Sequence, residues 1–206
     1  SQYEFTRTSD NDAIGGSSIG RNNESYGVNF ANNYLLNQNW SLSGSVGFRH
    51  TVTSAFLNNP ELANDGFLAN MNADYKGENY GANVAFFRSL MPSNLGQLQE
   101  VTGTTFHFFY KLNERLSAQL DTSYQNSSFI NAGQSSDRDN IIVHPSVNWM
   151  VDKDWTLTAA YRFRTQDRTG SFDGRFSRNS AQSTTADSDF FIFSVNYNWP
   201  GLKVSR

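Results

Sequence analysis

The side chains best suited to metal binding or proton transfer are three histidines, at positions 50, 107 and 144. His107 and His144 share the polar phase of two alternating segments, which would place them near one another and within reach of a common ion. No third ligand follows at a suitable spacing, so we expect no metal site and interpret both rings as polar packing. Cysteine is absent, which excludes disulfides and thiolate metal sites.

Charged side chains in the same polar phase form a second set with chemical potential. The residues predicted to face a common interior are Glu4, Arg49, Asp74, His107, Lys111, Asp121, His144, Arg162 and Arg164. They would form either a packed ionic plug or a selectivity constriction. Barrels of about eight to ten strands are filled by their own side chains, which favours the plug for a closed ten-stranded barrel; additional strands would favour the pore.

Arg162 and Arg164 stand two residues apart in that phase. Because an uncompensated buried charge costs several kcal/mol, we expect carboxylates to pair with them, with Asp121, Asp74 and Glu4 as candidates. The alternative is a solvated arginine ladder that lines a pore and attracts anions.

No catalytic constellation is legible. Acidic clusters at 9–12, 136–140 and 187–189 carry oxygen ligands that suit calcium, but none has the spacing of an EF-hand loop, so we interpret them as solvated loops. A protease site would need paired acids and an Asp/His couple, and His50 is the one histidine near a loop end. We therefore expect no enzyme and no cofactor.

The elements that position these residues are clearest in the hairpin 101–124. Both arms alternate with a period of two around a polar turn at 112–115, which is typical of β-strands. Each arm has about ten residues, the length that a tilted strand needs to cross a bilayer. One face is aromatic and aliphatic and the other carries Ser, Thr, Gln and Asp, as in a transmembrane barrel wall with lipid outside and water inside.

The composition agrees with a two-faced sheet. Only 37% of the 206 residues are hydrophobic and the mean hydropathy is -0.57, yet 15% are aromatic, which argues against disorder. The longest apolar run, Phe190–Phe193, is far too short for a transmembrane helix. A net charge of -3 gives no reason to expect nucleic acid. The chain begins without Met or a basic leader, so for an exported protein we expect a processed sequence.

The same alternation recurs along residues 1–206, for which we expect a single domain of about ten strands. Every second connection is a tight turn (37–39, 76–79, 112–115 and 151–154), and the others are long loops (10–23, 54–65, 91–99, 126–139 and 165–187). Outer-membrane barrels combine an even strand count with short periplasmic turns and long extracellular loops. The sequence therefore predicts an all-β, antiparallel up-and-down transmembrane β-barrel in a bacterial outer membrane, with both termini in the periplasm.

Large aromatic residues gather at the tight-turn ends of the predicted strands. Such a row is expected at a membrane interface. The predicted aromatic girdle consists of Trp40, Tyr75, Tyr80, Tyr110, Trp149, Trp155 and Trp199.

Two stretches, NYGANVAFFRSLMPSNLGQLQEVTGTTFHFFYKLNERLSAQLDTSY (79–124) and NYNWPGLKVSR (196–206), resemble the β-barrel proteins encoded with bacterial exopolysaccharide and exosortase systems. The resemblance implies an outer-membrane location, a link to surface polysaccharide and no catalytic residues. Members of that group are longer, so it also implies the C-terminal portion of a larger barrel. The ending departs from the usual barrel pattern, because PGLKVSR follows Trp199.

The sequence thus favours a non-enzymatic outer-membrane barrel with a structural or transport role, linked to surface polysaccharide export. The expected partners are outer-membrane lipid and polysaccharide or export-machinery proteins. The first alternative is a narrow porin-like diffusion channel. A soluble lipocalin-like binder is the second, and it would need an apolar interior and a polar outside.

Overall fold

The computed structural model describes residues 2–13, 20–53, 62–92, 98–130, 136–170 and 182–198. These residues form one sheet of ten strands. The strands are β1 (Gln2–Ala13), β2 (Gly20–Leu35), β3 (Trp40–Thr53), β4 (Leu62–Lys76), β5 (Tyr80–Pro92), β6 (Leu98–Lys111), β7 (Leu116–Ile130), β8 (Ser136–Asp152), β9 (Trp155–Gly170) and β10 (Gln182–Tyr197).

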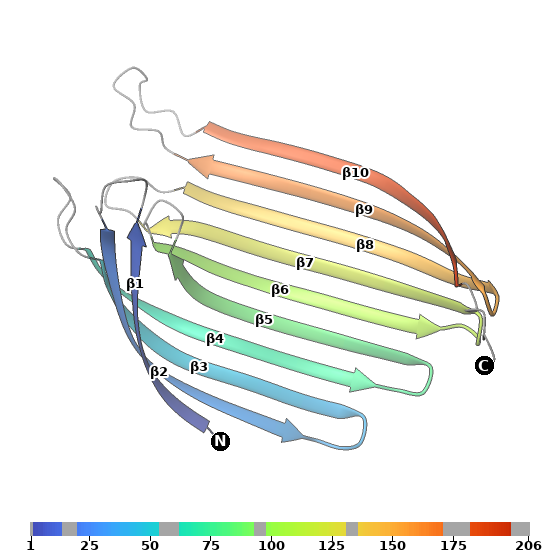
Figure 1. The fold of residues 1–206 in the computed structure, drawn as a ribbon, viewed down its shortest axis with the longest axis horizontal. Coiled ribbons are helices and arrows are strands. Elements are labelled where there is room, and N and C mark those ends of the chain that lie inside the picture. The colour runs from blue at the N-terminus through green and yellow to red at the C-terminus, as the bar shows by residue number, and fades with distance from the viewer. Residues whose placement is uncertain are drawn as a thin grey trace, which may run out of the picture.

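Each strand pairs antiparallel with the next strand in the chain, so the spatial order is the sequence order (Figure 1). The predicted all-β, antiparallel, up-and-down architecture of ten strands is confirmed. In the part of the chain that the structure describes, no helix is long and apolar enough to span a membrane.

Asparagine side chains shape two of the tight turns. Asn37 Oδ1 accepts hydrogen bonds from the backbone N–H groups of Asn39 and Trp40, at 2.8 and 2.9 Å. Asn113 Oδ1 accepts from Arg115 N and Leu116 N, both at 2.8 Å. Such Asx turns reverse the chain within a few residues, which fixes the register of the strands on either side.

Several strands extend further toward the long loops than the sequence predicts. β8 begins at Ser136 rather than at 140, β9 runs to Gly170 rather than to 164, and β10 begins at Gln182. In these extensions both faces are largely polar, so the apolar alternation disappears while the backbone ladder continues. The predicted loops at 126–139 and 165–187 are therefore shorter than expected.

Pro145 interrupts one ladder, as a proline within a strand should, because it has no N–H to donate. The pairing of β8 with β9 runs to Val143 opposite Phe163 and resumes at Ser146 opposite Ala160. The interruption leaves the register unchanged.

The sheet bends into an arch, with β10 along the top of the view and the steeply inclined β1 at the left (Figure 1). Among the described residues, β1 pairs with β2 alone and β10 with β9 alone. The ten strands therefore form a curved wall, and closure of β1 onto β10, which a ten-stranded barrel requires, is not formed by them.

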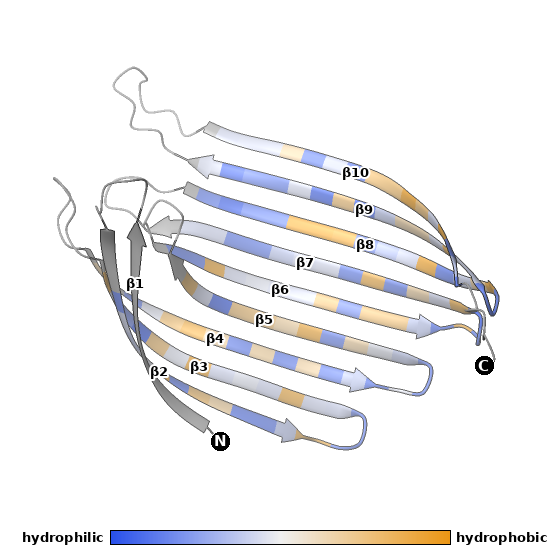
Figure 2. Ribbon diagram, in the orientation of Figure 1, coloured by the Kyte–Doolittle hydropathy of each residue, from blue (hydrophilic) through white to orange (hydrophobic). Residues whose placement is uncertain are grey.

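The outer face of this wall is the face that carries large exposed apolar side chains, and hydropathy alternates along the strands beneath it (Figure 2). Phe191 is 81% exposed, Phe193 72% and Phe48 69%. The opposite face, called the inner face below, is mostly polar. The outer face includes Val28, Phe30, Tyr34, Trp40, Leu42, Val46, Phe48, Phe67, Met71, Tyr80, Val84, Phe86, Tyr110, Tyr124, Ile141, Val147, Trp149, Trp155, Phe191, Phe193, Val195 and Tyr197.

The predicted aromatic girdle lies along the tight-turn end of this face. Tyr75 contacts Trp40 with ring centroids 4.9 Å apart and stacks on Tyr80 at 5.2 Å, and Tyr80 pairs with Tyr110 on β6. On the far strands, Trp155 packs on Tyr197 at 4.6 Å.

Trp149 is exposed at the same end, and Trp199 lies outside the described residues. The row is therefore present in the described strands, and its position at a membrane surface stays a prediction.

β2 and β3 approach each other closely at Gly47. A Cβ at this position would lie 2.6 Å from the Val28 carbonyl oxygen, a backbone atom, and 3.0 Å from Asn29 Oδ1. We expect Gly47→Ala to destabilise the fold by about 1–3 kcal/mol, as overpacking does, in a denaturant titration of the detergent-solubilised protein.

Gly44→Ala is the matched control on the same strand, because its Cβ would meet Asn70 O at an ordinary 3.5 Å. Equal stability of the two variants would contradict this packing of β2 against β3.

Candidate functional site

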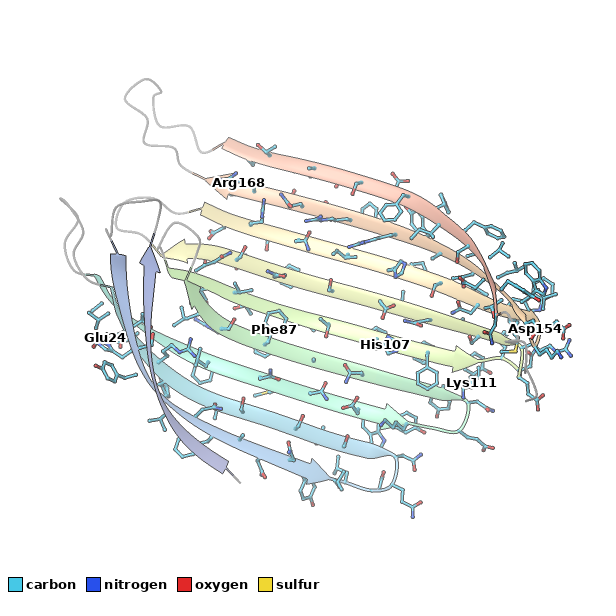
Figure 3. All side chains as sticks on the ribbon, in the orientation of Figure 1. Glu24, Phe87, His107, Lys111, Asp154 and Arg168 are labelled. Carbon is cyan, nitrogen blue, oxygen red and sulfur yellow. The ribbon has the colours of Figure 1, made fainter. Side chains whose placement is uncertain are left out.

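The strand register places the predicted interior residues on the inner face, and side chains project from both faces of the ribbon in Figure 3. Those that share this face are Arg49, Asp74, His107, Lys111, Asp121, His144, Arg162 and Arg164. The side chain of Glu4 lies outside the described part of the structure. Whether this face lines a lumen stays a prediction.

Asp121 joins the histidines of β6 and β8. His107 stands directly opposite Asp121 on β6, and His144 directly opposite on β8. The Asp121 carboxylate lies 2.5 Å from His107 Nδ1, 3.8 Å from His144 Nδ1, and accepts a hydrogen bond from Gln119 Nε2 at 2.8 Å. The row His107–Asp121–His144 therefore forms a polar side-chain cluster that spans three strands near the middle of the wall.

In the described strands no group of three His, Asp or Glu side chains has the geometry to hold a metal ion. The two histidines thus meet around a carboxylate, and their role as polar packing stays a prediction.

Asp74 anchors a second polar cluster, between β4 and β5. Asn83 Nδ2 donates to Asp74 Oδ1 at 2.6 Å and to Asn72 Oδ1 at 2.7 Å, and Asn72 Nδ2 donates to Asp74 Oδ2 at 2.5 Å. Three polar side chains thus satisfy one another, and the carboxylate accepts from both amides.

Arg49 holds the loop end of β5 over the inner face. Its Nη1 donates to the backbone oxygen of Leu90 at 3.1 Å. The Leu90 side chain lies over Gly66, where a Cβ would come within 1.7 Å of Leu90 Cδ1. The β4–β5 ladder ends at Ala69 opposite Arg88, and β5 curves at this end (Figure 1).

The prediction that Asp121 and Asp74 pair with Arg162 and Arg164 is wrong. Arg164 Nε donates to Asn140 Oδ1 at 2.8 Å and Arg164 Nη2 to Gln166 Oε1 at 3.2 Å. The Arg162 guanidinium lies over the Phe190 ring, 5.8 Å from its centroid. His144 stands between Asp121 and the row position of Arg162, so the carboxylate is used by the histidines.

Two further inner-face arginines lie where the sequence predicts loops. Arg138 on β8 stands directly opposite Arg168 on β9, and both share the face of Arg162 and Arg164. Arg168 is labelled near the loop end of β9 in Figure 3. The predicted loops at 126–139 and 165–187 contained both residues, so no phase was assigned to them. The alternation Asp137–Arg138–Asp139 was the signal that would have revealed one of them.

Lys111 lies at the opposite end of the inner face. It lines a hollow of about 550 Å³ beside the tight turns, together with Ser117, Asn148 and Thr156. Glu114 and Arg115 of the tight turn line the same hollow, so it carries charges of both signs.

No family model matches the chain, and no curated protein matches it. Among solved structures, the outer-membrane expressed OmpT of Vibrio cholerae is similar, with 12% identity, a TM-score of 0.49, and coverage of 88% of this chain and 57% of that one. This chain thus spans little more than half the length of that protein. A likeness at this level assigns neither family nor function.

We expect the contacts of the Asp121 carboxylate with its neighbours to stabilise the sheet. We expect Asp121→Ala to lower the free energy of unfolding by roughly 1 kcal/mol, because His107 and Gln119 lose their acceptor while the half-exposed site keeps access to water. Ser123→Ala, the next inward position on β7, is the matched control.

A double-mutant cycle with His107→Ala isolates the pair, and additive effects of the two substitutions would contradict a stabilising contact.

Proposed function

We propose that this chain forms part of the wall of an outer-membrane β-barrel whose lumen passes hydrophilic solutes. The observation that supports it is the inverted two-faced sheet, with large apolar side chains exposed on the outer face and hydrogen-bonded polar side chains on the inner face. A soluble barrel needs the reverse arrangement. An exposed apolar surface of this extent calls for lipid or another apolar partner.

The outer apolar band has limits that suit a bilayer. On β3 it runs from Trp40 to Phe48 and on β9 from Trp155 to Phe163, and the outward charges or polar residues begin beyond these limits at His50 and Thr165. Nine residues at about 3.3 Å each, tilted by about 40°, cover about 20–25 Å, close to the apolar band of outer-membrane barrels.

The open edges favour a channel over a plug. In hydrocarbon an unpaired strand edge leaves its N–H and C=O groups unsatisfied, so a membrane barrel must close. Because β1 and β10 lie apart, closure requires further strands beyond the ten described. A barrel wider than ten strands has more interior than its side chains can fill, so water enters the lumen.

The remaining features of this proposal follow from barrel architecture. The tight turns would face the periplasm, as would both ends of the chain, and outer-membrane lipid would contact the outer face. The link to surface polysaccharide and to export-machinery proteins rests on the sequence resemblance alone, and added oligosaccharide that interrupts the current would support it.

Reconstitution into a planar bilayer tests the channel directly. We expect the closed barrel, this chain together with the strands that complete its wall, to give stepwise openings, because a water-filled lumen conducts ions. Protein-free detergent diluted in the same way is the control. A silent bilayer with protein that is demonstrably inserted would contradict the channel and favour a structural wall.

A further inference from the structure

We propose that the inner face of β8 and β9 carries an arginine ladder that binds and conducts solutes with several phosphate or carboxylate groups. The ladder consists of Arg138, Arg162, Arg164 and Arg168. The inference rests on the proposed channel and names the class of solute that this channel selects.

The strongest support is the separation of charge between the two faces of β8, β9 and β10. The register places all four arginines on the inner face. On the same strands, five acidic side chains take outward positions, where they lie on the far side of the sheet from the ladder. These are Asp137, Asp139, Asp167, Asp187 and Asp189.

The ladder is not neutralised by its neighbours. Among the described residues, no carboxylate forms an ion pair with any of its four arginines; Arg164 contacts amide oxygens, and Arg162 an aromatic ring. Among the described residues of β7 to β10, Asp121 is the one carboxylate on the inner face, and it contacts His107 and Gln119, with His144 at 3.8 Å, and no arginine. The residues around the ladder are uncharged: some are polar, including Gln125, Ser127, Thr184 and Ser188, and others, such as Ile142 and Phe190, are apolar.

The arrangement is unfavourable without a counterion. Arg138 and Arg168 stand directly opposite each other, and like charges at such positions destabilise a sheet. Multivalent anions remove this repulsion, because a guanidinium binds carboxylate or phosphate with two parallel hydrogen bonds. From Arg162 to Arg168 the ladder extends over about 20 Å at about 3.3 Å per residue. A solute with several anionic groups can therefore engage successive arginines, whereas a monovalent anion engages one.

The low-dielectric wall strengthens the attraction of the arginine charges for anions that pass through the lumen. A channel lined by one sign of charge raises the local concentration of the opposite ion, and dissolved salt screens this field over about 10 Å at 0.1 M. Anion preference should therefore be greatest at low salt.

The test measures reversal potentials of the closed barrel, this chain together with the strands that complete its wall, in planar bilayers under a KCl gradient at low salt. We expect chloride to permeate better than potassium. In the variant R162Q/R164Q/R168Q the permeability ratio should fall by about threefold or more, as for the loss of a surface potential of about one kT or more. Asp167→Asn is the matched control, since it changes one charge on β9 but on the outer face, and the ratio should stay unchanged.

Added tripolyphosphate and citrate probe the solute class. Both should reduce the chloride current of the unaltered chain at concentrations well below those at which inorganic phosphate does. Block by tripolyphosphate alone would assign phosphate chains, and block by citrate alone would assign polycarboxylates. The lysine variant R162K/R164K/R168K should keep the chloride preference and lose much of the block, because an ammonium lacks the bidentate fork.

A cation-preferring unaltered channel, or a permeability ratio that the glutamine variant leaves unchanged, would overturn the proposal while the channel stands. Heat-dependent mobility in detergent gels checks that each variant folds, and R164Q alone replaces the triple variant if that one does not fold. If the unaltered protein does not conduct, the proposed function fails. Calorimetric titration of the solubilised protein with tripolyphosphate then tests separately whether the ladder binds multivalent anions. Binding that R164Q weakens supports the ladder, and no binding overturns it.

Discussion

The pairing of backbone hydrogen bonds between ten consecutive strands is the constraint on which every other feature depends. Each strand bonds to its sequence neighbours, so alternate side chains must project from opposite faces. In a membrane this ladder is also obligatory, because hydrocarbon offers no partner for a free N–H or C=O. Because of this period of two, exposed aromatic rings such as Phe48 and Phe193 lie on one face of the sheet, and amides and charged groups lie on the other.

The inner face combines local polar clusters with an uncompensated ladder. Asp121 and Asp74 each accept hydrogen bonds from side chains on adjacent strands, and Thr158 donates to Asn148 Oδ1 at 2.7 Å between β9 and β8. These contacts add to the backbone ladder between neighbouring strands, and among the described residues the buried apolar side chains are Ala69, Leu90, Val101 and Ala160. The arginines of β8 and β9 differ, because their acidic sequence neighbours project from the other face. A chain with a net charge of -3 thereby presents a positive inner surface on these strands.

Most strands of this fold can be predicted from the sequence, and the strand ends that could not be predicted have a physical explanation. Alternation and short polar turns predict the strands where one face is apolar. Beyond the apolar band the ladder continues through residues that are polar on both faces. The sequence therefore predicts β8, β9 and β10 too short at their loop ends, and it places Arg138 and Arg168 in loops.

The phase of a strand also does not give the height of its residues. The tight turn at 112–115 sets His107 opposite Asp121, so this contact was open to prediction. The loop predicted at 126–139 gives no register for β8 against β7. The third member, His144, therefore could not be placed opposite Asp121, where it takes the position that the predicted Asp121–Arg162 pair would have needed.

The central claim is that the outer face contacts lipid and the inner face contacts water. Val147 and Ser146 are neighbours on β8 that project from opposite faces, and the chain has no cysteine to interfere with labelling. Spin labels at V147C and S146C, in protein reconstituted into vesicles, report collisions with oxygen, which concentrates in lipid, and with a water-soluble nickel complex. We predict that oxygen dominates at position 147 and nickel at position 146. Equal accessibility at both positions, or the reverse order, would contradict the account.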